Sequence, residues 1–386
     1  MPTMVRGSES TANVNTSQHV RDVEPRLRYL NPSATPFTVI LADTGKAPAD
    51  NFKFEHGEKA NAPDKDQVNN GAGYSSSATA VVVDNSEYFY VGALVKVPRT
   101  AEVMRVTAVT TATDTLTVVR GVGSTAGAAL VDNDDLFIIG SAFAEGSAGP
   151  DALSHQETIP FNYTEIFKKA VAASRTQQQT KSYFGNNRTR QRKEMAKEFK
   201  LDLERAFIFG ERNRDTTDTA APRNYTGGVL YWATSNAKDF NGTVTEPEVW
   251  DWCEDLFANT GGSDTRTAFG SPTFVTVVDL LAGARLQTVS ADRTYGIKVN
   301  EWITSHGTLL IIKHRMLVNG AGGQGYGGHV LGLEMSKLRY RYLQDMTLQT
   351  DVQDNDEDGW RDQYLAEVGL EFANPELHGI GTEATG

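Results

Sequence analysis

The clearest periodic pattern along the chain lies between residues 188 and 210. Apolar residues recur there at every fourth position while Arg, Lys and Glu fill most of the others, and the apolar set is Met195, Phe199, Leu203 and Phe207. Gly210 follows as a residue type that commonly ends a helix. At about 1.5 Å per residue, this pattern predicts an amphipathic helix more than about 30 Å long.

A second helical pattern begins at Thr245. Thr245 and Glu248 have the spacing of a capping box, with Pro247 in the first turn. One face of the predicted helix is apolar and consists of Val249, Trp250, Cys253, Leu256 and Phe257. Downstream, the run Thr273–Val278 predicts a buried strand, and Asp279 is expected to cap a short helix after it.

Residues 77–140 have a different pattern, with short runs rich in Val, Thr and Tyr between turn residues. This spacing predicts a compact β-barrel or sandwich inserted into the chain. The expected strands are Thr79–Val83, Tyr88–Val91, Leu94–Val97, Glu102–Val109, Thr115–Arg120 and Leu136–Ile139.

The segments on either side of this insert have few apolar positions. Residues 44–76 have Phe52 and Phe54 as their main apolar anchors, and the alternation from Phe52 to Glu55 predicts a strand. Residues 156–172 alternate in the same way and supply a return strand. A lone hairpin is only marginally stable in water, so this ribbon is either loosely ordered or supported by a neighbouring subunit.

The C-terminal third reads as mixed sheet. Together with the helices, it predicts an α+β fold that carries a separate β insertion. The expected strands are Thr308–Ile312, Arg315–Val318, His329–Glu334, Leu338–Tyr342 and Tyr364–Phe372.

Charge is concentrated at the C-terminal end of the 386-residue chain. The net charge is −12, and residues 345–386 contain eleven acidic residues against one basic residue, Arg361. A sequence-specific nucleic-acid binder would need the opposite sign. No apolar run approaches the roughly 20 residues of a membrane span. One cysteine and an N-terminus without a signal-peptide pattern indicate synthesis in a reducing, intracellular compartment.

Two segments match parts of known ligand-binding motifs, but the residues around them do not fit those motifs. Gly320–Gly325 matches the glycine spacing of a dinucleotide-binding loop, but a strand-like segment follows it where a helix is required. Asp354, Asp356 and Asp358 match the first half of a calcium loop, whose twelfth position would be Leu365. We interpret the acidic segment as a solvated hairpin tip or one paired with another subunit, and a weak cation site is the smaller alternative.

Catalytic constellations are missing from the sequence. The seven histidines show no metal-ligand spacing, no nucleophile-elbow motif occurs, and Cys253 lies on the apolar face of its helix. His314 lies in an apolar run and is expected to be a packed residue. We therefore predict no catalytic, cofactor-binding or metal-binding residues and no enzyme activity.

The long helix begins with a basic cluster formed by Arg188, Arg190, Arg192 and Lys193. Cations are disfavoured at a helix N-terminus, so the cluster hints at an acidic partner. The interpretations are a solvated face, a salt-bridge partner for an adjacent subunit, or direct contact with DNA.

Four stretches, taken in order, resemble one protein family. They are RDVEPRLRYLNPSATPFTVIL (21–41), the helix RQRKEMAKEFKLDLERAFIFGER (190–212), the Gly-rich segment 314–343 and QYLAEVGLEFANPELHGIGT (363–382). Together they resemble the major capsid proteins of tailed bacteriophages with the Hong Kong 97-type fold. The resemblance covers most of the chain outside residues 77–140.

This resemblance implies a division of the chain. Residues 1–43 would form an N-terminal arm and the segment leading into the fold, and residues 44–160 an extended loop carrying the 77–140 insert. Residues 161–225, with the spine helix 188–210, and residues 335–386 would form the peripheral domain, the latter with its closing strands and C-terminal tail. Residues 226–334 would form the axial domain.

The resemblance also implies a function. The chain would assemble into hexamers and pentamers of an icosahedral shell that encloses double-stranded phage DNA without sequence-specific binding. It would be made in the host bacterial cytoplasm and reside in the virion, with scaffold, portal and decoration proteins as further candidate partners. The alternatives are a nanocompartment shell of the same fold and a β-rich virion module for binding or adhesion. Candidate inter-subunit contacts are Phe52, Phe54, Glu55, Arg188, Arg190, Arg192, Lys193, Asp354, Asp356, Asp358 and Trp360.

Overall fold

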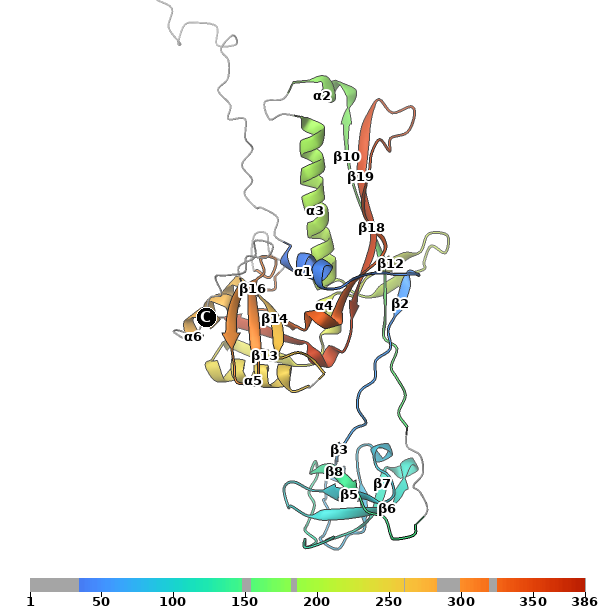
Figure 1. Ribbon diagram of the computed structural model, residues 1–386, viewed down its shortest axis with the longest axis vertical. Coiled ribbons are helices and arrows are strands. Elements are labelled where there is room, and N and C mark those ends of the chain that lie inside the picture. Colours follow the sequence, from blue (N-terminus) through green and yellow to red (C-terminus); the bar gives the residue numbers. More distant parts are fainter. Residues whose placement is uncertain are drawn as a thin grey trace, which may run out of the picture. The chain divides into compact units, whose positions relative to one another are not determined.

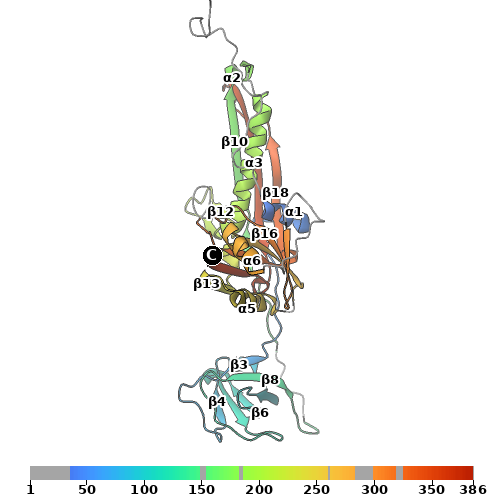
Figure 2. The ribbon, with the colours of Figure 1, turned by 90° about the vertical axis from the view of Figure 1, so that its left-hand side faces the viewer.

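The computed structural model describes residues 35–147, 154–181, 186–259, 261–282, 299–318 and 325–385. The chain divides into two compact units (Figures 1 and 2). Unit 1 consists of Met1–His56 with Pro160–Gly386, and unit 2 consists of Gly57–Ile159. The expected N-terminal arm and most of the Gly320–Gly325 loop lie outside the described residues.

The long helix is the central element of unit 1. Helix α3, Asn187–Phe209, confirms the predicted helix and buries Phe199, Leu203 and Phe207. The Asn186 side chain accepts a hydrogen bond from the Thr189 amide and so caps its N-terminus. The helix packs along a four-stranded sheet, which in spatial order contains β1 (Lys46–Pro48), β18 (Leu338–Gln349), β19 (Gly359–Phe372) and β10 (Glu165–Ser174).

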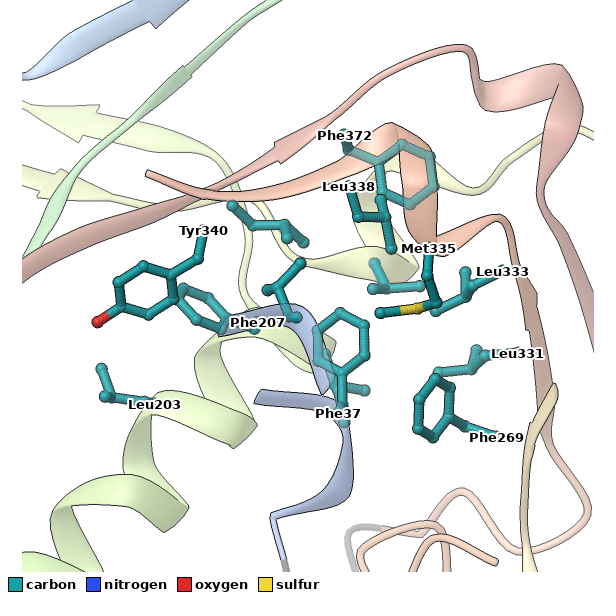
Figure 3. Close-up of a cluster of buried hydrophobic side chains, with 14 of the residues drawn as sticks. Phe37, Leu203, Phe207, Phe269, Leu331, Leu333, Met335, Leu338, Tyr340 and Phe372 are labelled. Atoms are coloured by element: carbon teal, nitrogen blue, oxygen red, sulfur yellow. The ribbon is translucent and has the colours of Figure 1, made fainter. Parts of the chain in front are cut away.

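The core of unit 1 gathers side chains from distant parts of the sequence (Figure 3). Helix α1, Pro36–Thr44, inserts Phe37 edge-on against Phe269, with ring centroids 5.5 Å apart. The Phe207 ring of α3 meets Tyr340 of β18 in the same geometry at 5.6 Å. Aromatic contacts of this kind add to the stabilisation from burial.

A six-stranded mixed sheet forms the rest of unit 1. Helix α5, Glu246–Phe257, has the predicted capping box, and together with α6, Pro272–Ala282, it buries a second core around Trp252 and Phe274. The strands, in spatial order, are β13 (Ala237–Thr243), β20 (Gly379–Thr385), β17 (Val330–Leu333), β14 (Thr265–Gly270), β16 (Thr308–Lys313) and β15 (Val299–Ile303).

The expected strand Thr273–Val278 is wrong, because this segment lies in α6. The Ser271 hydroxyl accepts a hydrogen bond from the Phe274 amide and starts the helix. Burial of Phe274, Val277 and Val278 follows helical spacing, which a short apolar run does not distinguish from a buried strand. Asp279 consequently lies inside the helix and does not cap it. The expected strand Arg315–Val318 is also wrong, since these residues form a turn.

Unit 2 is a six-stranded antiparallel sheet whose edges meet at a single bridge between Val68 and Val83. It begins earlier than the predicted insert, because residues before position 77 supply an edge strand. The expected strand Tyr88–Val91 is wrong, since Ser86–Tyr88 forms a short 3-10 turn. The strands are β3 (Lys65–Gln67), β8 (Asp135–Ser141), β5 (Ala93–Lys96), β6 (Val103–Thr110), β7 (Thr115–Val119) and β4 (Ala80–Val82).

The ribbon expected near Phe52 is confirmed as a short antiparallel pair. Strand β2, Lys53–Glu55, pairs with β9, Phe161–Tyr163. Further along the two segments, one bridge joins Glu58 and Thr158. The remaining short elements of unit 1 are α2 (Arg175–Gln179), β11 (Asn213–Asp215), β12 (Arg223–Tyr225) and α4 (Val229–Trp232).

Candidate functional site

Two arginines of the basic start of α3 are paired with a carboxylate of the same chain. Asp362, fully buried on β19, accepts hydrogen bonds from Arg188 Nε at 2.9 Å and Nη2 at 2.6 Å, and from Arg192 Nε at 2.7 Å. Burial would raise the pKa of Asp362, but the two guanidinium groups outweigh it and hold that pKa well below its usual range. The acidic partner that the sequence hinted at is therefore a residue of the same chain.

The rest of this cluster also has contacts within unit 1. The Arg188 guanidinium lies 4.8 Å from the centre of the Trp360 ring, which is buried, and its Nη2 contacts Asp351 at 2.7 Å. Arg190 donates to Asn187 at 2.8 Å. Lys193 is exposed. The candidate contact residues Arg188, Arg192 and Trp360 thus fix the end of α3 to the sheet.

The acidic segment forms the turn between β18 and β19. Asp354, Asp356 and Asp358 are all exposed there, as expected for a solvated hairpin tip. Asp358 contacts Arg175 at 2.9 Å, with both side chains more than two-thirds exposed. Such an exposed pair contributes little to stability. The tip is therefore a strongly negative, accessible surface.

The ribbon residues divide into one internal anchor and two surface groups. Phe54 is buried, with the Arg341 guanidinium 5.7 Å from its ring centre. Phe52 is half-buried and stacks on Tyr163 with ring centroids 6.3 Å apart. Glu55 is exposed and pairs with Lys53. Only Phe52 and Glu55 therefore remain accessible at this site.

Sequence reasoning missed a buried carboxylate that ties α1 to α3. Glu204 accepts hydrogen bonds from the amides of Phe37 at 3.0 Å and Thr38 at 2.7 Å, and His314 Nε2 lies 2.8 Å from it. A negative charge at a helix N-terminus is favourable, so Glu204 acts as the cap that Thr35 does not provide. Its sequence signal was hidden, because Glu204 looks like one more charge on a charged helix.

A second missed centre fixes loops around the six-stranded sheet. Arg266 is buried beside Glu334 and donates from Nε to the Leu377 carbonyl at 3.1 Å. Glu334 also accepts from the Ser336 hydroxyl at 2.7 Å. His378 accepts at Nδ1 from the Glu334 amide at 3.2 Å, and burial lowers the pKa of His378 to about 4. The imidazole therefore stays neutral near neutral pH.

Unit 2 has a buried ion pair of its own. Glu102 and Arg120 form a bidentate contact at 2.8 and 2.7 Å, and both side chains are almost completely buried. The amides of Gly121 at 3.1 Å and Ala128 at 2.9 Å complete the shell around the carboxylate. Although burial opposes ionisation, these bonds lower the pKa of Glu102. The pair fixes the 121–128 loop against the sheet.

These centres use charge for cohesion within each unit. Across the described ranges, no three His, Cys, Asp or Glu side chains are grouped as a metal site would require. None of the helices in those ranges combines the length and apolar character that a membrane crossing needs. The predicted contact residues that remain exposed are the acidic hairpin turn, Glu55 and Lys193.

Comparison with known proteins gives these surfaces a context. The family profile of the SU10 major capsid protein matches residues 7–385. Over 252 residues the chain is 27% identical to the major capsid protein of Pseudomonas phage PaMx41, and the match covers 62% of this chain but only 60% of that relative's length.

Solved structures align along most of the chain. The capsid of a native GTA particle aligns with a TM-score of 0.52 at 9% identity, over 98% of this chain and 99% of that one. A protein of Mycobacterium phage Bobi aligns over the same shares, with a TM-score of 0.49 at 11% identity. At such low identity the GTA likeness bears on the fold alone, and the α+β structure fits the Hong Kong 97-type fold that the family resemblance implied.

Family membership follows from the sequence match. The family profile covers nearly the whole chain, including residues of both units. This protein belongs to the SU10 major capsid protein family.

Proposed function

We propose that this chain is the major capsid protein of a bacteriophage and assembles into an icosahedral shell around double-stranded DNA. The observation that carries the proposal is the match to a capsid family along almost the full chain. The net negative charge supports a container for DNA, because an acidic surface does not hold the polymer it encloses. Synthesis in the host bacterial cytoplasm and residence in the virion are part of this proposal.

Each region has a role in the proposed shell. Residues 1–43 form the arm and the segment leading into the fold, and residues 44–160 form an extended loop that carries the small β-unit. Residues 161–225 and 335–386 form the peripheral domain around α3. Residues 226–334 form the axial domain. Ring-closing contacts between copies would build hexamers and pentamers.

The candidate contact residues sort by what they already do within the chain. We propose that Phe52, Glu55 and Lys193 meet neighbouring copies directly, together with Asp354, Asp356 and Asp358. Phe54, Arg188, Arg190, Arg192 and Trp360 contribute indirectly, because their contacts within unit 1 set the shape of the surface that neighbours meet.

The family match favours a phage shell over a nanocompartment, because the matched family and the relative from Pseudomonas phage PaMx41 are both described as major capsid proteins. The match also disfavours an adhesion module built around unit 2 alone, because it extends over both units. Scaffold, portal and decoration proteins would be further partners of such a shell.

Size-exclusion chromatography with light scattering, followed by negative-stain electron microscopy, tests the proposal on the purified full chain. We expect closed particles or rings of hexamers and pentamers. A chain that stays monomeric over a hundredfold range of concentration, with or without co-expressed phage assembly proteins, would contradict the proposed function. A monomer that instead bound glycans would favour the adhesion module.

A further inference from the structure

The six-stranded sheet of unit 2 has one face that is left uncovered. Its inner face buries Val95, Met104 and Leu136, whereas the residues that alternate with them along each strand point outward. Cross-strand pairs place Lys65, Phe137 and Lys96 in one row across β3, β8 and β5. A second row contains Leu94, Arg105 and Val119. We call these two rows the outer face.

The outer face collects the unpaired positive charge of unit 2. Unit 2 has six Lys or Arg residues, and three of them, Lys59, Arg99 and Arg120, pair with carboxylates of the same unit. The other three are those of the outer face, and within the described residues none of them has an ion-pair partner: Lys65, Lys96 and Arg105. Asp64, immediately before Lys65, and Asp135 are exposed acidic residues beside this face, and Asp135 accepts a hydrogen bond from Gln67 at 3.0 Å.

Large apolar side chains lie on the same face. Phe137 is 40% exposed and Val119 is 43% exposed. Ile139, in the bulge of β8 opposite β5, is 46% exposed. Contiguous exposed apolar residues with a charged rim are typical of protein interaction surfaces, and an aromatic centre is typical of the residues that dominate binding energy.

The same chain carries the complementary surface. The hairpin turn between β18 and β19 exposes Asp354, Asp356, Glu357 and Asp358 within five residues and contains no base. Arg175 contacts Asp358 at 2.9 Å from outside the turn, and both side chains are exposed. The arginines that sequence reasoning offered as partners, Arg188 and Arg192, are occupied by Asp362. Within the described residues, Asp354, Asp356 and Glu357 have no ion-pair partner, so these carboxylates remain accessible to positive charge from another molecule.

We propose that the outer face of unit 2 docks the acidic hairpin turn of a second copy of this chain. This inference rests on the proposed shell function and names one of its contacts. Lys65, Lys96 and Arg105 would face the carboxylates, while Phe137 would exclude water at the centre of the contact. Charge complementarity of this kind selects the partner and its register more than it adds raw affinity. Repetition around a ring makes a weak contact effective, because each copy is held at several points.

A charge-exchange experiment tests the contact in the full chain. Lys65→Glu with Lys96→Glu, or Asp354→Lys with Asp356→Lys, should each lower the yield of particles at least about tenfold at low salt. The chain carrying all four substitutions reverses both surfaces, keeps the wild-type net charge and should regain most of the yield. Lys200→Glu with Lys313→Glu is the matched control, since both lysines are exposed in unit 1. Unchanged melting temperatures verify that every variant folds.

Disulfide trapping gives a second readout. The native cysteine, Cys253, is buried, so it adds little background. Mixing Lys96→Cys chains with Asp356→Cys chains and assembling them should give a cross-linked heterodimer under non-reducing conditions. Cross-linking only when both cysteines are in one chain would show an internal contact and overturn the proposal.

The outcomes separate this inference from the function it rests on. Wild-type particles whose yield neither paired reversal changes, or a fourfold variant that assembles no better than the paired ones, would overturn the docking contact alone. A wild-type chain that forms no particles would overturn the proposed function and the contact with it.

Discussion

The two compact units handle charge in opposite ways. Unit 1 brings its strongest basic cluster into contact with its own buried carboxylate, since Arg188 and Arg192 both bind Asp362. Unit 2 buries one complete pair, Glu102 with Arg120, and leaves three bases without an ion-pair partner on an exposed, partly apolar sheet face, namely Lys65, Lys96 and Arg105. In unit 1 the charges of this cluster find their partners within one molecule. In unit 2 the charges of the buried pair do so, whereas the bases on the outer face do not.

This difference teaches that a cluster of like charge does not by itself mark an interface. The helix start looked like the better candidate for contact with a neighbour because its charge opposes the helix dipole. A buried acid 170 positions away in sequence removes the conflict. The bases of unit 2 drew no attention because they are scattered along the sequence, and only strand pairing gathers them on one face.

The largest effect we predict is the loss of the buried pair in unit 2. Arg120→Leu leaves Glu102 buried without its cation, which should destabilise unit 2 by about 3–5 kcal/mol. Limited proteolysis during thermal denaturation should show unit 2 opening before unit 1. Arg105→Leu, which removes an unpaired base from the same unit, should change stability by less than about 0.5 kcal/mol. Equal effects of the two substitutions would mean that the buried ion pair stabilises unit 2 no more than an unpaired surface base does.

A change of pH should affect unit 1 more than unit 2. Burial lowers the pKa of His378 to about 4, so the unfolded chain binds a proton between pH 6.5 and 4 that the folded chain does not. The free energy of unfolding therefore keeps its full value above pH 6.5 and falls by up to about 3 kcal/mol as the pH drops to 4. Chemical denaturation at several pH values measures this loss, and His378→Gln should reduce it. The only histidine of unit 2, His155, is exposed.

Removing the acid at the end of α3 should have the next largest effect. Asp362→Asn leaves two arginines without a charged partner, and because both remain partly exposed we expect a loss of about 2 kcal/mol. The loss should appear in the unfolding of unit 1 and leave unit 2 unchanged. A chain with wild-type stability in denaturant titration would show that the cluster contributes no cohesion.

The smallest effect on the isolated chain is expected at the hairpin turn. Asp354→Asn with Asp356→Asn removes exposed charges and should change stability by less than about 0.5 kcal/mol. The same variant should nevertheless assemble with weaker dependence on salt concentration, since fewer ion pairs are left to screen. A large loss of stability in the dilute chain would mean that the turn serves its own unit.

The sequence predicted regular elements well where a single face determines burial. Helix α3 was predicted from Phe199, Leu203 and Phe207, and α5 from its capping box. It failed at Thr273–Val278, where an apolar run of six residues fits a buried strand as well as a helix, and the cap at Ser271 decides between them. The fold class came from the order of segments and the family resemblance.

The buried polar centres could not be predicted in the same way. Glu204 and His314 are 110 residues apart, and Arg266 and Glu334 are 68 apart. Each pair meets only because the sheets and helices bring the segments together. The partners of Arg188 and Arg192 escaped prediction for this reason. Periodicity reports which face of an element is apolar, and it carries no information about such long-range partners.

Hydrogen–deuterium exchange on the dilute single chain and on assembled particles tests the central claim that neighbours complete the surfaces this chain leaves open. We predict that amides in residues 57–64, 154–159 and 350–358 exchange quickly in the dilute chain and become protected in particles. The amides of the α3 core, and likewise those of the unit 2 sheet, should be protected in both states. Full protection of those three segments in the dilute, solitary chain would contradict the account.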